Sequence, residues 1–293
     1  TWGAISRSGL VSYASSLDQI GLHSASLRLL KTVLPLLMAP DPLDQTCAPS
    51  DLRSPVAEKR GRIAVLRHDD GTAAPVRTAL DNAAEAFAGA GYTCDTVDLR
   101  LRDLISAAYF TIATAEASAN LARYDGIRYG SRPLAELEQD ELVRRARRDG
   151  FGAEVRRRVV VGTHVLRSGY RDRYYRRAQQ ARAGIRAELT EILATHDALM
   201  LPVYPILPFP FGSEGLSAAE ERLADRFTCL ANLAGLPAIS VPFGTAEGLP
   251  TAVQLVGSPW SEELLLDLAG ELAQHSSPVP PPGYQWPGED SNG

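Results

Sequence analysis

Residues 62–99, RIAVLRHDDGTAAPVRTALDNAAEAFAGAGYTCDTVDL, decide the fold class of this chain. The stretch opens on a short apolar run, RIAVLRH, and closes on YTCDTVDL, which has strand character. Between them, apolar residues recur at helical spacing on one face. These residues are Val76, Ala79, Leu80, Ala83 and Phe87. The stretch therefore predicts a strand, a helix and a second strand.

The same alternation continues toward the C-terminus. Strands are predicted in DALMLPVYPI (197–206), AISVPF (238–243) and TAVQLVG (251–257), and helices over 218–234 and 261–274. This order favours an α/β fold in which helices cover both faces of a mixed, largely parallel central sheet.

Two longer helices are predicted between these units, over 106–123 and 151–193. The second is interrupted near Ser168 and Gly169, because glycine weakens a helix interior. We expect both to form a layer over the edge of the sheet.

Composition excludes several classes of protein. A chain of 293 residues with 45% hydrophobic content can bury a large core. The net charge of -5 argues against a protein that binds nucleic acid mainly through the electrostatic field of the whole molecule. Residues 27–38 form the most apolar stretch, which is too short to span a bilayer and predicts a buried helix. The three cysteines are widely spaced and lack a CxxC pair, which fits neither a disulfide framework nor a zinc site.

The sequence predicts one main domain and a tail. Residues 1–275 carry the periodic segments, whereas 276–293 are rich in proline, glycine and polar residues and predict a flexible extension. Residues 40–59 have a similar, linker-like composition.

Common catalytic motifs are absent from the sequence. It contains no GxSxG, HExxH, Walker loop or GxGxxG, and its five histidines are isolated. These observations argue against a Ser-His-Asp hydrolase. Ser240 lies in a predicted strand without a base nearby in sequence, so a structural role is the simpler interpretation.

Four segments carry a family resemblance. They are TWGAISRSGLVSYASSLDQIG (1–21), FTIATAEASANLARYDGIRYG (110–130), FGAEVRRRVVVGTHVLRSGYRDRYYRRAQQARAGI (151–185) and CLANLAGLPAISVPFGTAEGLPTAVQLVG (229–257). Together they resemble amidase signature proteins, and within that family the A subunits of glutamyl-tRNA(Gln) amidotransferases. The resemblance implies the amidase signature fold, here truncated at its N-terminus.

The resemblance also implies where the chemistry lies. Amidase signature enzymes use a Ser, cis-Ser, Lys triad, in which lysine activates the nucleophile through a bridging serine. In the family these residues precede the segment that matches Thr1, so we expect no catalytic residue within this sequence. The isolated chain is therefore expected to be inactive.

For the substrate, the resemblance implies three contacts to glutamine: Tyr129, Arg182 and Asp225. An arginine fork can hold the α-carboxylate and an aspartate the α-ammonium. Arg157 and Arg158 belong to the same matched segment as Arg182 and are alternatives to it. Each residue also has an ordinary structural interpretation. Tyr129 could lie at the edge of the core, Arg182 could be a solvated charge on a helix, and Asp225 could lie on the polar face of a helix.

Partners follow from the same resemblance. The complete A subunit is a glutaminase that assembles with B and C subunits, and its ammonia serves a carbon–nitrogen ligase reaction that converts Glu-tRNA(Gln) to Gln-tRNA(Gln). ATP and magnesium are expected to bind the partner subunit, and this chain is expected to bind no cofactor. We expect it to meet tRNA only indirectly, through the complex, and to have no membrane contact. The expected location is the cytoplasm of a bacterium, or the mitochondrial or plastid matrix of a eukaryote. The alternatives are a stand-alone amidase of small amides and a non-catalytic interaction protein.

Residues 144–186 contain fourteen arginines against three acidic residues. One interpretation is phosphate binding, because each arginine that meets a phosphate adds salt-dependent affinity. The simpler interpretation is a set of solvated helix faces, some of them facing acidic partner surfaces.

Overall fold

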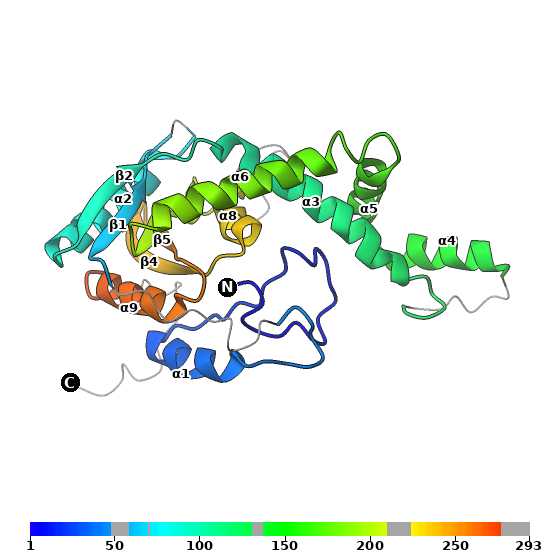
Figure 1. Cartoon of the computed structure of the whole chain (residues 1–293), viewed down its shortest axis with the longest axis horizontal. Coiled ribbons are helices and arrows are strands. Elements are labelled where there is room, and N and C mark those ends of the chain that lie inside the picture. Colours follow the sequence, from blue (N-terminus) through cyan, green and yellow to red (C-terminus); the bar gives the residue numbers. More distant parts are fainter. Residues whose placement is uncertain (48–58, 70, 131–136, 210–223, 277–293) are drawn as a thin grey trace.

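The computed structural model describes residues 1–47, 59–69, 71–130, 137–209 and 224–276 (Figure 1). Its sheet has the strand order β2-β1-β3-β5-β4. The strands are β1 Arg62–Leu66, β2 Thr93–Val97, β3 Ala198–Pro202, β4 Ala238–Ala246 and β5 Leu249–Val256. Each predicted strand is present, which confirms the α/β class.

The sheet is mixed. Strand β1 pairs in parallel with β2 and β3, whereas β5 pairs antiparallel with β3 and β4. The antiparallel end arises from a hairpin, because β4 and β5 are joined by Glu247 and Gly248 alone. Both residues have positive φ, as the tightest hairpin turns require.

The helices largely follow the predictions. They are α1 Leu27–Leu37, α2 Ala74–Gly89, α3 Ile105–Asn120, α4 Gln139–Gly150, α5 Ala153–Leu166, α6 Tyr175–Leu193, α8 Arg226–Ala234 and α9 Glu262–Ala273. The predicted break in 151–193 is confirmed as a turn between α5 and α6. Helix α4 was not predicted, and residues 218–223 lie outside the described residues.

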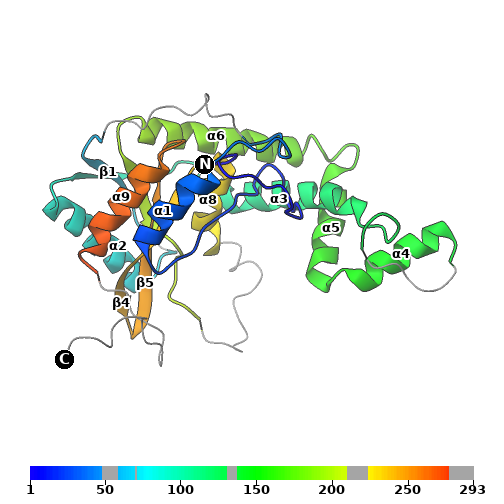
Figure 2. The ribbon, with the colours of Figure 1, turned by 90° about the horizontal axis from the view of Figure 1, so that it is seen from below.

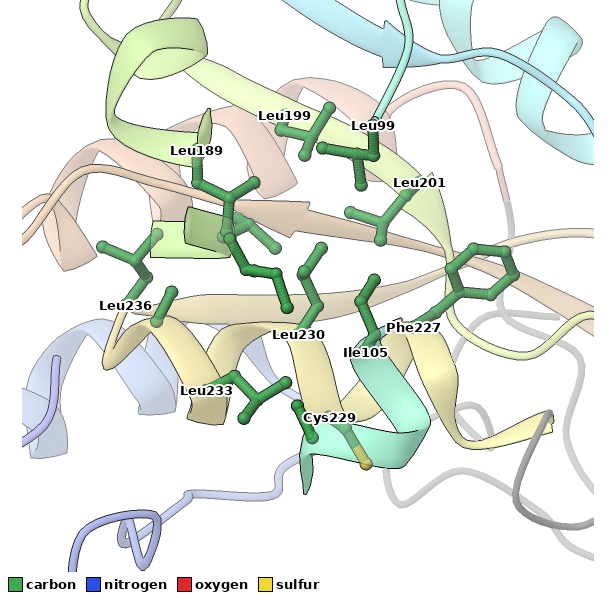
Figure 3. Close-up of a cluster of buried hydrophobic side chains, with 14 of the residues drawn as sticks. Leu99, Ile105, Leu189, Leu199, Leu201, Phe227, Cys229, Leu230, Leu233 and Leu236 are labelled. Atoms are coloured by element: carbon green, nitrogen blue, oxygen red, sulfur yellow. The ribbon is translucent and has the colours of Figure 1, made fainter. Parts of the chain in front are cut away.

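Helices cover both faces of the sheet, as predicted, but α3 and α6, which were expected over the sheet edge, pack on one of these faces. Helices α2 and α9 pack on one face, where Phe87 and Leu268 meet Met200 of β3 in one buried cluster. Helices α3, α6 and α8 pack on the other face, where Leu199 and Leu201 of β3 share a cluster with residues such as Leu230 (Figure 3). The alternation of β3 residues between the two clusters follows from the period of two in a strand.

Helix α1 corrects one prediction. The helix forms, but none of its residues is buried, and the side chain of Leu36 is 74% exposed. It lies beside α9 on the surface, where Lys31 pairs with Asp267 at 2.6 Å (Figure 2). A helix whose apolar residues lie along one face needs only that face to be covered by a neighbour. Apolar content alone therefore does not require the whole helix to be buried. Among the described helices, none combines the length and apolar content that crossing a membrane requires.

Part of the predicted linker packs against the start of the chain. Ser6 Oγ donates to Asp41, and the Arg7 backbone N–H donates to Asp44 at 2.8 Å. A hydrogen bond from the Thr46 side chain is the main reason that the pKa of Asp44 falls to about 2. Residues 40–47 are therefore an ordered part of the fold, whereas residues 48–58 and the predicted tail beyond Ser276 lie outside the described residues.

Candidate functional site

Residues 12–19, here called the opening loop, form one wall of the site. Asp18 accepts hydrogen bonds from the backbone N–H groups of Tyr13 and Ala14, both at 3.1 Å. Ala14 and Leu17 are buried and anchor the loop in the α3, α6 and α8 cluster. The loop is therefore a folded turn that presents its serines to the neighbouring helices.

Helix α3 supplies two polar side chains that hold this loop. Glu116 accepts from the Ser16 backbone N–H at 2.9 Å and from Ser16 Oγ at 2.6 Å. Asn120 donates to the Tyr13 carbonyl at 3.2 Å and to Ser15 Oγ at 2.9 Å. Glu116 and Asn120 lie four residues apart, so they share one face of the helix.

Helix α6 brings Arg182 to the other side of Ser16. Its Nη1 and Nη2 donate to Ser16 Oγ and to the Ser16 carbonyl, each at 2.7 Å, and Nε donates to the Leu233 carbonyl of α8 at 2.8 Å. Burial lowers the pKa of Arg182, while the nearby Glu116 opposes this effect. Ser16 is thus held between a cation and an anion, and all three nitrogens of the guanidinium are engaged within the protein.

A second group of side chains surrounds Tyr109 of α3. Burial raises the pKa of Tyr109 to about 12, with Cys229, Tyr13 and Asp225 adding to the rise and Arg158 opposing it. Burial, assisted by Asp225, likewise raises the pKa of Cys229 to about 12. Arg158 of α5 and Asp225 at the start of α8 thus act in opposite directions on the pKa of the same phenol.

Arg158 is positioned by neighbours on two sides. Its Nη1 donates to the Tyr13 hydroxyl at 2.6 Å, and its Nε donates to Glu154 at 2.7 Å. Burial acts to lower the pKa of Arg158, but these two hydrogen bonds outweigh it and raise that pKa. The side chain therefore joins α5 to the opening loop as a fixed positive charge.

The three predicted contacts are differently placed. Asp225 lies at the N-terminal cap of α8 within the group around Tyr109. Arg182 donates two hydrogen bonds to Ser16 of the opening loop. Tyr129 follows the end of α3, is 56% exposed and has its ring 5.9 Å from that of Tyr124. Arg182 thus contacts the opening loop, Asp225 raises the pKa of Tyr109 on α3, and Tyr129 lies at the surface.

Sequence reasoning missed Tyr13, Ser16, Tyr109 and Glu116 as members of the site. Tyr13 and Ser16 lie inside the quoted segment 1–21, so the motif contained them. Nothing in the local pattern of α3 distinguishes Glu116 from a solvated helix residue. Its role depends on the opening loop, which is 100 residues away.

A cavity of about 420 Å³ lies beside Gln19, at the end of the opening loop. Its lining includes Gln19, Asn232 and Ser240, together with apolar residues of α1 and α9. Asn232 donates to Gln19 at 3.0 Å, so much of the polar lining is paired internally. Tyr129, Arg182 and Asp225 are not among the lining residues, and this cavity is separate from the group around Tyr109.

The described residues offer no metal centre. No group of three or more histidine, cysteine or acidic side chains among them is arranged to hold a metal ion. Cys47, Cys94 and Cys229 are free thiols.

Replacing Arg182 with methionine should loosen the opening loop. The change removes three charge-assisted hydrogen bonds, so we expect a loss of about 2 kcal/mol in the free energy of unfolding. Hydrogen exchange at residues 13–18 should become faster. Arg186→Met, one turn along α6 on an exposed side chain, is the control. Equal exchange rates in the two variants would show that Arg182 does not hold the loop.

Comparison with known proteins places this arrangement in a family. The family model described as Amidase matches residues 1–266. The chain belongs to the amidase family. The family match agrees with the α/β architecture and the mixed sheet described above.

Individual relatives of this amidase chain carry a more specific name. The A subunit of glutamyl-tRNA(Gln) amidotransferase from Legionella pneumophila (strain Paris) is 38% identical over 284 residues, covering 94% of this chain and 59% of the relative. The protein of the same name from Synechococcus sp. (strain CC9311) is 41% identical over 290 residues, covering 94% and 58%. The amidase chain thus spans a little under three fifths of the length of these relatives.

A solved structure agrees with this comparison. The crystal structure of the glutamyl-tRNA(Gln) amidotransferase A subunit from Thermotoga maritima matches with a TM-score of 0.71 and 31% identity. The match covers 94% of this chain and 57% of that protein. The fold of the amidase chain is therefore that of part of a known amidase structure.

Proposed function

We propose that this amidase chain forms the glutamine-recognition part of the A subunit of a glutamyl-tRNA(Gln) amidotransferase. Such a protein hydrolyses glutamine and supplies ammonia for the conversion of Glu-tRNA(Gln) to Gln-tRNA(Gln). Identity of 38% and 41% to proteins of that name supports the proposal. The structural observation that supports it is that Arg158 and Asp225 act in opposite directions on the pKa of one buried phenol, that of Tyr109.

A free amino acid has the matching charges. Its α-carboxylate suits the guanidinium of Arg158, and its α-ammonium suits the carboxylate of Asp225. We assign carboxylate binding to Arg158 rather than Arg182, because all three Arg182 nitrogens donate to Ser16 and Leu233, whereas in Arg158 only Nε and Nη1 donate to described residues. Arg182 then acts by positioning the opening loop, and Tyr129 is proposed as the third contact, from the loop after α3.

The remaining parts of the reaction are proposed to come from elsewhere. The nucleophilic serine, the bridging serine and the lysine are assigned to polypeptide preceding Thr1. The B and C subunits complete the complex, with ATP and magnesium on one of these partners. In a bacterium the assembly would work in the cytoplasm.

The test is glutamine hydrolysis by the complete enzyme with its partners. Arg158→Lys and Asp225→Asn should each raise KM for glutamine about tenfold or more, because each loses a charge-assisted hydrogen bond to substrate. The effect on kcat should be smaller. Arg156→Lys, on an exposed side chain of the same helix, is the matched control. An unchanged KM in both test variants would reject the assignment.

Two further outcomes separate the alternatives. Hydrolysis of simple amides with a kcat/KM equal to that for glutamine would favour a stand-alone amidase. Ammonia release by the 293-residue chain alone would contradict the assignment of the nucleophile to preceding polypeptide.

A further inference from the structure

The turn between α5 and α6 gathers positive charge and aromatic rings at the surface. Residues 164–177, here called the arginine–tyrosine turn, contain five arginines and one acidic residue, Asp172. The arginines are Arg167, Arg171, Arg173, Arg176 and Arg177, and their charges lie at or near the surface. The turn lies at the end of α6 that is far from the sheet (Figures 1 and 2).

These arginines differ from four arginines of the neighbouring helices that are held in ion pairs. In α4, Arg145 and Arg148 both form ion pairs with Asp149. In α5, Arg157 and Arg158 both form ion pairs with Glu154. No ion pair joins any of the five arginines of the turn to another described residue. Their charge is consequently available to a ligand.

The aromatic rings of the turn form a stack. The rings of Tyr170 and Tyr174 lie 6.0 Å apart with planes inclined by only 12°, and the His164 ring lies 4.6 Å from that of Tyr170. Tyr170 is 36% exposed and Tyr174 is 40% exposed. The guanidinium of Arg173 lies 5.7 Å from the centre of the Tyr174 ring. Flat rings and guanidinium groups are thus presented side by side.

The backbone of the turn holds this arrangement. The Arg167 carbonyl accepts from the N–H groups of Tyr170 and Arg171, and the Tyr170 carbonyl accepts from Tyr174 N–H at 2.9 Å. Gly169 supplies the positive φ of 84° that the reversal needs. The start of α6 adds the partial positive charge of a helix N-terminus.

We propose that the arginine–tyrosine turn binds single-stranded nucleic acid. Arginines engage the phosphates, and the exposed rings of Tyr170 and Tyr174 stack with bases, which is the combination that sequence-tolerant strand binders use. This inference goes beyond the proposed function, because it gives this chain itself a contact to nucleic acid and does not depend on the glutamine site.

One consideration favours this ligand over an acidic protein surface, and a second removes an objection to it. Tyrosine and arginine are enriched in protein interfaces as well, but the five arginines and the exposed flat rings together supply both the phosphate contacts and the stacking platforms of a single-strand binder. The net charge of -5 does not prevent the contact, since charges farther away than the Debye length of about 8 Å are largely screened at physiological ionic strength.

The experiment measures the fluorescence anisotropy of a labelled adenine RNA while the full chain is titrated into it at several salt concentrations. The RNA has about 12 nucleotides, which is within the usual site sizes of single-strand binders. Arg171→Gln with Arg173→Gln should weaken binding about tenfold and reduce the salt slope by about 1.4, because each of the two lost phosphate contacts lowers that slope by about 0.7 for a single strand. Tyr170→Leu with Tyr174→Leu should weaken binding about tenfold with the slope unchanged, because stacking carries no counterion release. Circular dichroism checks that each variant is folded.

The matched control is Arg145→Gln with Arg148→Gln, which removes the same charge from arginines already paired with Asp149 and should leave the affinity within about twofold. Poly-glutamate serves as the competitor that mimics an acidic protein surface. The proposal fails if wild-type protein does not bind the RNA, if the tyrosine variant binds as wild type does, or if poly-glutamate displaces the RNA at equal charge concentration.

Discussion

Replacing Gly162 with alanine should destabilise the protein by about 3 kcal/mol, although alanine is the better helix former. Gly162 lies where α5 crosses α3. A methyl group added there would stand 1.9 Å from the carbonyl oxygen of Thr114 and 2.8 Å from Cβ of Ser118. The obstructing oxygen belongs to the backbone of α3, so no side-chain rotation relieves the clash.

The measurement is urea unfolding followed by circular dichroism. Gly89→Ala is the matched control, because Gly89 is the last residue of α2 and an added Cβ meets nothing within 4 Å. That change should stabilise the protein by up to about 1 kcal/mol through helix propensity. Gly162→Ala at wild-type stability would mean that α3 and α5 do not pack as closely as described.

The Gly162 crossing also connects packing to function. Helix α5 carries Arg158, and α3 carries Tyr109 and Glu116. Separating the two helices would move Arg158 relative to Tyr109. Under the proposed function, the same variant should therefore also raise KM for glutamine in the complete enzyme with its partners.

Replacing Asp197 with alanine should destabilise the protein by roughly 3 kcal/mol, because hydrogen bonds to a charged acceptor are lost together. Asp197 is 2% exposed and precedes β3. Its carboxylate accepts from the backbone N–H groups of Arg60 and Gly61, each at 2.7 Å, and from that of Arg62 at 3.2 Å. The side chain thus fixes the entry of β1 beside β3.

The check is the urea midpoint of Asp197→Ala against that of Asp267→Ala. Asp267 pairs with Lys31 on the surface, where both side chains are largely exposed, and such pairs contribute at most about 1 kcal/mol. Similar midpoints for the two variants would show that the β1 entry is held by other contacts.

Local patterns predicted most secondary structure. All five apolar residues assigned to one face of the helix in 74–89 are buried in α2, because helical periodicity depends on residues only three or four positions apart. Helix α4 was missed because its sequence lacks this periodicity. Its sequence, QDELVRRARRDG, has no apolar stripe, and Leu142 is its one buried residue.

Burial was less predictable than element type. The stretch 27–38 is apolar enough for a core helix, yet α1 lies on the surface beside α9. Whether an apolar stripe is enclosed depends on how many elements surround it, and the stripe itself carries no information about them.

By itself, the sequence determined the order of the strands and of most helices, the mixed α/β class and the family resemblance. Only the tertiary structure separated two arginines of one matched segment. Helix α5 brings Arg158 to the hydroxyl of Tyr13, whereas α6 directs Arg182 onto Ser16. The physical reason is that element type depends on neighbours along the chain, whereas contacts from α5 and α6 to the opening loop form only when distant segments pack together.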